Sequence, residues 1–151
     1  MTTPSPVTTR PATAGDLPEV HRMLIALAAR HGLPATITPR VLARIALEGR
    51  AARLLVALRA DSPQRHPVGF ALVILGRNMV AGADWGVVEQ LYVQEPDRGR
   101  GIGRALLAAA RAEAADAGCE GLTVSTRPET DGAALVWRAL GPDREPRFAA
   151  E

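Results

Sequence analysis

Three glycines within five residues, Gly99, Gly101 and Gly103, separate an apolar run from an alanine- and leucine-rich segment. The apolar run, Val87 to Val93, has the composition of a strand. After the glycines, apolar residues recur at the spacing of one helix face: Ile102, Ala105, Leu106, Ala109 and Ala110. Glycine lets backbone N–H groups face open space because it has no Cβ, and a helix N-terminus adds the positive end of its dipole. This strand–loop–helix unit therefore suits the binding of a phosphate group.

The glycine spacing distinguishes between phosphate-binding motifs. A Walker loop requires a lysine, and all 18 basic residues of this chain are arginine. The alternating glycines also fail the Gly-x-Gly-x-x-Gly dinucleotide fingerprint. The segment Arg98-x-x-Gly101-x-Gly103 instead resembles the Gln/Arg-x-x-Gly-x-Gly/Ala loop of the GNAT superfamily of N-acetyltransferases. A tight turn without a ligand is the alternative, but two arginines inside the loop favour an anionic partner.

The resemblance extends over residues 7 to 141 and implies a cofactor, acetyl-coenzyme A. In the family this loop wraps the coenzyme's pyrophosphate, and backbone groups of the preceding strand meet its pantetheine. A tryptophan, Trp137, stands where many members have a catalytic tyrosine, so it would form an apolar wall beside the sulfur. The implied cofactor-binding residues are Leu91, Tyr92, Val93, Arg98, Gly99, Arg100, Gly101, Ile102, Gly103, Arg104 and Trp137.

Glu89 is the candidate catalytic base, because it is a carboxylate in an otherwise apolar strand that lines the cleft in the resembling family. Strand alternation places Glu89, Leu91 and Val93 on one face and Tyr92 on the other. The alternative is that Glu89 points into solvent or pairs with an arginine. Asp84 and Glu48 are weaker acidic candidates. No general acid is evident, because indole does not donate a proton in the relevant pH range.

The predicted element order is β-α-α-β-β-β-α-β-α. Strands are expected at Val7–Arg10, Arg53–Leu58, Val68–Leu75, Trp85–Val93 and Leu122–Ser125. Helices are expected after Asp16, from Thr38-Pro39 to Gly49, after the glycine loop, and at Ala133–Leu140. The second of these would carry Val41, Leu42, Ile45 and Ala46 on one buried face. Asp16 would be the first helix's N-cap, with Glu19 completing a capping box.

The resemblance implies an α/β (α+β) fold with a mixed, mostly antiparallel central sheet flanked by helices. At 151 residues the chain is expected to form a single domain, residues 1–151, with its core at about 7–141. Family members normally add two strands after the last helix, so the C-terminal end is shortened here. A sheet short of strands has an unpaired edge, which predicts a homodimer.

The composition of the chain argues against nucleic acid, metal ions and membranes as binding partners. The net charge of +2 is too small to indicate nucleic-acid binding. The single cysteine, Cys119, and three histidines without ligand spacing predict no metal site. There is no signal-peptide pattern and no apolar run of about 20 residues, which predicts a cytoplasmic protein with no membrane contact.

The expected function is transfer of an acetyl group from acetyl-coenzyme A to a primary amine of a small molecule or protein. The alternative is a non-catalytic module that binds acyl-coenzyme A.

Overall fold

The computed structural model describes residues 7–61, 65–79 and 82–124. In these residues the chain forms a five-stranded sheet in which spatial order follows sequence order. Neighbouring strands pair antiparallel except β4 and β5, which are parallel. This confirms the mixed, mostly antiparallel sheet; the helix expected at 133–140 lies outside the described residues. The strands are β1 (Val7–Pro11), β2 (Ala52–Arg59), β3 (Pro67–Asn78), β4 (Ala83–Val93) and β5 (Gly121–Val124).

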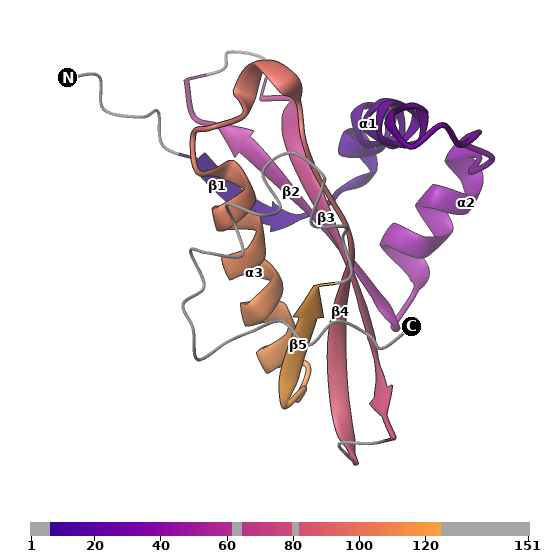
Figure 1. Ribbon diagram of the computed structural model, residues 1–151, viewed down its shortest axis with the longest axis vertical. Coiled ribbons are helices and arrows are strands. Elements are labelled where there is room, and N and C mark those ends of the chain that lie inside the picture. The colour runs from indigo at the N-terminus through magenta and orange to yellow at the C-terminus, as the bar shows by residue number, and fades with distance from the viewer. Residues whose placement is uncertain (1–6, 62–64, 80–81, 125–151) are drawn as a thin grey trace.

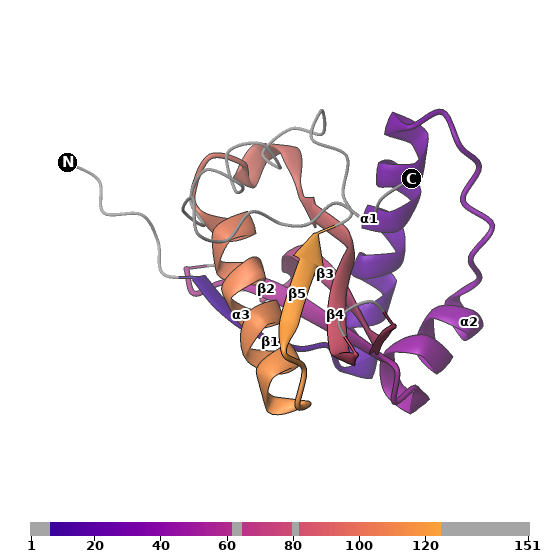
Figure 2. The same cartoon turned by 60° about the horizontal axis from the view of Figure 1, so that its bottom comes forward.

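Helices cover both faces of the sheet (Figures 1 and 2). Helix α3 (Ile102–Asp116) packs on one face, and α1 (Leu17–Arg30) and α2 (Pro39–Ala43) pack on the other. Each face therefore has its own apolar core. The α1 side contains Leu17, Val20, Met23, Leu27, Leu42, Leu54, Val56, Leu58 and Phe70. No helix in the described part of the chain is long and apolar enough to cross a membrane.

The second helix begins as the sequence predicts but changes pitch. Thr38 is its N-cap, and the Thr38 hydroxyl accepts a hydrogen bond from the backbone N–H of Val41 at 3.2 Å. After Ala43 the chain widens into a π-helical turn, Arg44–Glu48, that ends at Gly49. Val41, expected on the buried face, is 42% exposed. Leu42, Ala43 and Ala46 contact the core instead, so the buried face is rotated from the predicted one.

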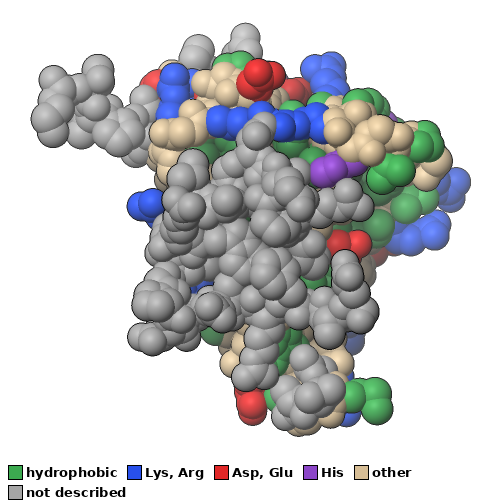
Figure 3. Space-filling model, in the orientation of Figure 1, with side chains coloured by type: hydrophobic (Ala, Val, Ile, Leu, Met, Phe, Trp, Pro, Cys, Tyr) green, Lys and Arg blue, Asp and Glu red, His purple; other side chains and the backbone are tan. Residues whose placement is uncertain are grey.

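The entry to α1 corrects the predicted capping box. Charged side chains are visible on the face drawn in Figure 3, but Asp16 is buried. Its carboxylate makes no cap bond to α1. It accepts hydrogen bonds from the Thr13 backbone N–H (2.7 Å) and hydroxyl (3.0 Å), and it pairs with Arg10 at 2.6 Å. The capping box is therefore formed by Thr13 and Asp16, three residues before the predicted pair, and Glu19 takes no part in it.

Replacing Asp16 with asparagine should destabilise the protein in a pH-dependent way. Burial by itself would raise the pKa of the Asp16 carboxyl, but the hydrogen bonds from Arg10 and Thr13 outweigh it and lower that pKa. A carboxylate with a lowered folded-state pKa stabilises the fold above its unfolded pKa, about 3.9 for Asp, and loses this effect as pH falls through the folded value. The free energy of unfolding at pH 7 should fall by about 2 kcal/mol in D16N, as expected for hydrogen bonds to a charged group.

Urea denaturation at pH 7 and at successively lower pH measures this difference. The gap between the wild type and D16N should narrow once the pH drops below about 4. The control is D84N, because Asp84 is exposed and its pair with Arg77 is long, at 3.4 Å; a change within about 0.5 kcal/mol is expected there. An equal gap at every pH would show that the Asp16 charge is not what stabilises the turn.

Candidate active site

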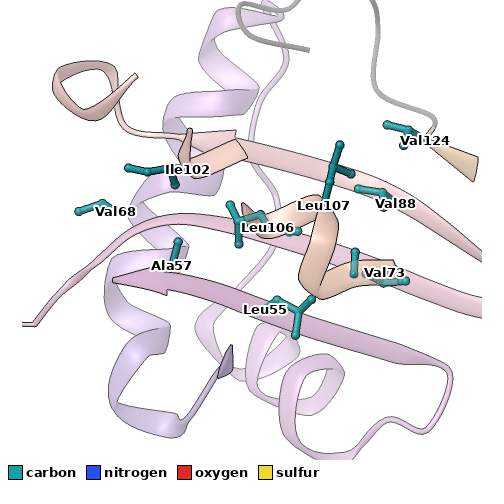
Figure 4. Close-up of a cluster of buried hydrophobic side chains, with 11 residues drawn as sticks. Leu55, Ala57, Val68, Val73, Val88, Ile102, Leu106, Leu107 and Val124 are labelled. Atoms are coloured by element: carbon teal, nitrogen blue, oxygen red, sulfur yellow. The ribbon is translucent and has the colours of Figure 1, made fainter. Parts of the chain in front are cut away.

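The first turn of α3 is fixed by its packing on the sheet. Ile102, the first residue of the helix, is 2% exposed and lies in the same cluster as Leu106 and Val68 (Figure 4). Gly69 makes this contact possible, because a Cβ at this position would meet the Tyr92 carbonyl oxygen at 2.8 Å and the Leu106 side chain at 3.2 Å. The helix N-terminus is thereby held close to the end of β4.

The glycine loop adopts the open conformation that the sequence indicates. Gly99 and Gly101 have φ angles of 79° and 83°, a left-handed region that disfavours side chains. No atom lies within 4 Å of where a Cβ would stand at either residue. Gly101 is the N-cap of α3, and its carbonyl accepts from the Ala105 N–H at 3.0 Å. First-turn N–H groups have no acceptor within a helix, so an anion can bind them here.

The loop arginines divide into two kinds. Arg100 and Arg104 are exposed. Arg98 folds back: its Nε donates to the Val93 carbonyl at 2.9 Å, and its guanidinium carbon lies 5.4 Å from the centre of the Tyr92 ring. Arginine side chains line the surface over the segment between β4 and α3 (Figure 3). Arg100 and Arg104 therefore supply exposed positive charge within and just after the glycine loop.

Hydrogen-bond alternation along β4 determines which backbone groups remain at its far edge. The Gln94 N–H donates to Val68 on β3 at 2.8 Å. Tyr92 lies two residues earlier in the same antiparallel ladder, so its backbone N–H and C=O also point toward β3. The backbone N–H and C=O of Leu91 and Val93 point the other way, toward the β5 side of β4. Pairing with β5 ends at Val88 and Val124 among the described residues. Leu91 and Val93 thus present backbone groups to the edge, although the Val93 carbonyl is bound by Arg98.

The side chains of this strand end follow the predicted alternation. Leu91 and Val93 pack against the α3-side core, and Tyr92 packs on the α1 side, with its ring centre 6.2 Å from that of Phe70. Tyr92 therefore contributes to the core, and its contact with a cofactor stays a prediction.

Glu89 is the extra residue of a β-bulge. Leu72 pairs with Gln90 and Val73 pairs with Val88, so no residue of β3 lies opposite Glu89. A bulge breaks the alternation of side chains and re-aims the extra residue, so alternation alone does not define the face of Glu89. The side chain is exposed and forms no ion pair with the described residues. Glu89 is therefore an accessible carboxylate at the point where β4 and β5 stop pairing.

The other sequence candidates are less favourably placed. Asp84 pairs with Arg77 at the far end of β4, and Glu48 is exposed at the end of the π-helical turn. Burial raises the pKa of the Cys119 thiol, with a further contribution from Asp84, which disfavours a nucleophilic thiolate. The described residues contain no cluster of His, Cys, Asp or Glu side chains suited to a metal ion. Trp137 lies outside the described residues.

Two contacts at the base of the loop were not evident in the sequence. Asp97, in the 3-10 turn Glu95–Asp97, is buried and accepts from Arg59 of β2 at 2.8 Å. Hydrogen bonds to Asp61 and then Asp97 raise the pKa of the Arg59 guanidinium. The Gln94 side chain donates to Glu19 of α1 at 3.1 Å. The partners of Asp97 and Gln94 lie 38 and 75 residues away along the chain, so no local pattern indicates these contacts.

Comparison with known proteins gives a family match. Residues 23–141 match the model of the acetyltransferase (GNAT) family. An aminoglycoside N(6')-acetyltransferase type 1 from Stenotrophomonas maltophilia is 42% identical over 91 residues. That match spans 58% of this chain and 58% of the curated relative.

Several solved structures match this chain in fold. A transcriptional regulator from Bacillus halodurans matches with a TM-score of 0.73 and 26% identity, covering 90% of this chain and 92% of that one. An aminoglycoside acetyltransferase from an uncultured soil metagenomic sample, in complex with sisomicin, matches with a TM-score of 0.74 and 17% identity. That match covers 96% of this chain and 93% of the other.

Proposed function

Because this chain belongs to the GNAT family of acetyltransferases, we propose that it transfers an acetyl group from acetyl-coenzyme A to a primary amine. The observation that carries the proposal is the open glycine loop between the end of β4 and the anchored N-terminus of α3. Bound acetyl-coenzyme A would supply the acetyl group as a thioester.

Each part of the loop has a distinct role in this proposal. Backbone N–H groups of the Gly99–Gly103 segment bind the pyrophosphate, and Arg100 and Arg104 contribute positive charge. Backbone groups of Leu91 and Val93 at the strand edge hydrogen-bond the pantetheine amides. The Arg98 side chain donates to the Val93 carbonyl and so connects the start of the loop to the end of β4.

Glu89 acts as the base in this proposal. An alkylammonium has a pKa of about 10.4, so the amine must lose a proton before it attacks the thioester. An exposed carboxylate at the bulge can accept this proton directly or through one water molecule. A second candidate, non-catalytic binding of acyl-coenzyme A, is favoured by Trp137 at the position of the family's tyrosine.

The proposed substrate is a small cationic amine of the aminoglycoside class. Its support is the relative named as an aminoglycoside N(6')-acetyltransferase, at 42% identity. Exposed Glu89 would attract a polycationic amine as well as accept its proton. Acetylation of an aminoglycoside and polyamine panel, followed by release of free thiol, tests the activity; no turnover with any amine would favour the binding module.

Gly101→Val should abolish coenzyme binding measured by calorimetry. The valine side chain would occupy the space that is open at Gly101, and the φ of 83° would strain the residue. The matched control is Gly118→Val at the other end of α3, where φ is 84° and the Cβ position is equally open. Both variants should lose about 1–2 kcal/mol of stability from backbone strain. Equal coenzyme affinities in the two variants would refute the loop assignment.

Glu89→Gln should lower kcat by roughly 10²-fold or more and leave coenzyme affinity nearly unchanged, because it removes the base but no coenzyme contact. Steady-state kinetics across pH measure this. Glu120→Gln is the control, because Glu120 is an exposed carboxylate before β5 and outside the site. If kcat and its pH dependence survive in Glu89→Gln, the base lies elsewhere.

We also propose that the protein is a homodimer. In the described part of the chain β1 is an edge strand, and Ile25, Leu33, Val41 and Leu47 on the α1–α2 side are exposed. A second copy would cover such an edge or apolar surface. Light scattering at micromolar concentration should give about twice the chain mass of 15.9 kDa. A mass near that of one chain would rule the dimer out.

A further inference from the structure

We infer that Arg59 and Asp97 are positioning residues for the coenzyme. Their ion pair holds the base of the glycine loop in its binding conformation before the coenzyme arrives. The inference rests on the proposed function, because it assigns the ion pair a consequence for coenzyme affinity.

The ion pair joins two segments that are distant in sequence. Arg59 is the last residue of β2, and Asp97 is the last residue of the 3-10 turn that leads into the glycine loop. Asp61 accepts from Arg59 Nε at 3.0 Å and from Nη2 at 2.8 Å, which leaves Nη1 to donate to Asp97 at 2.8 Å. The Asp97 side chain is only 8% exposed, so water screens this contact weakly.

Two further contacts hold the same segment. Gln94 donates to Glu19 of α1, and Arg98 donates to the Val93 carbonyl of β4. The base of the loop, residues 94–98, is therefore attached to β2, α1 and β4. Only the tip, with its open left-handed glycines, lacks such attachments among the contacts that the structure describes.

These contacts affect coenzyme affinity because they order the loop before the coenzyme binds. A loop that must be ordered when its ligand binds costs affinity, and a loop already held in the bound conformation does not. The ion pair does not itself need to touch the coenzyme to act this way. It should change coenzyme affinity and KM for acetyl-coenzyme A, with little effect on kcat.

Asp97→Ala is the informative variant, because Arg59 keeps its contacts with Asp61 and is not left as an unpaired charge. Two measurements are made on the full chain: calorimetric affinity for coenzyme A, and amide hydrogen exchange of the peptide covering residues 94–103 without ligand. We expect about tenfold weaker affinity and faster exchange in this peptide, with kcat nearly unchanged. Asp61→Ala is the matched control; it removes the other partner of Arg59, and its affinity should stay within about twofold.

The two measurements separate the possible outcomes. Unchanged exchange in Asp97→Ala would overturn the inference, whether or not the protein binds coenzyme A. Faster exchange with unchanged affinity would also overturn it, because the contact would then be structural only. A wild-type protein that does not bind coenzyme A would refute the proposed function, and with it the coenzyme role of the pair. If Asp97→Ala does not fold, Asp97→Asn keeps the shape and removes the charge, and smaller shifts in the same directions are expected.

Discussion

The packing of the first turn of α3 against β3 is the contact on which the candidate site depends. Ile102 and Leu106 enter the core beside Gly69, where any larger residue would collide with the Tyr92 carbonyl. This contact brings the helix N-terminus to the end of β4 and leaves the intervening glycines exposed. Hydrophobic burial is not directional, but here it fixes the position of the backbone N–H groups in the first turn of α3.

The pairing of strand β4 changes along its length. Up to Val88 it is a central strand, paired on both sides. Beyond the bulge at Glu89 it pairs only with β3 among the described residues, and the backbone groups of Leu91 and Val93 face the other edge. The bulge therefore marks the point beyond which β4 has an unpaired edge among the described residues, and in the proposed function this edge binds the coenzyme beside the Glu89 carboxylate.

Two buried carboxylates, Asp16 and Asp97, hold connections between elements of the fold. Asp16 connects the end of β1 to the start of α1 through Arg10 and Thr13, and Asp97 connects the loop base to β2 through Arg59. Each buried charge is paired, as the cost of desolvation requires. Polar contacts thus fix the connections between elements, while the two apolar cores fix the elements themselves.

The sequence by itself determined the strands, the helix after the loop, the glycine conformations and the family. These follow from short-range patterns: alternation, helical spacing, capping by Thr38, and glycines at left-handed positions. Only the tertiary structure decided the bulge at Glu89, the buried face of α2, and the contacts of Glu19 with Gln94 and of Asp97 with Arg59. Strand register and these two side-chain contacts depend on residues that are distant along the chain and meet only when the sheet and helices pack, so no local pattern of residues specifies them.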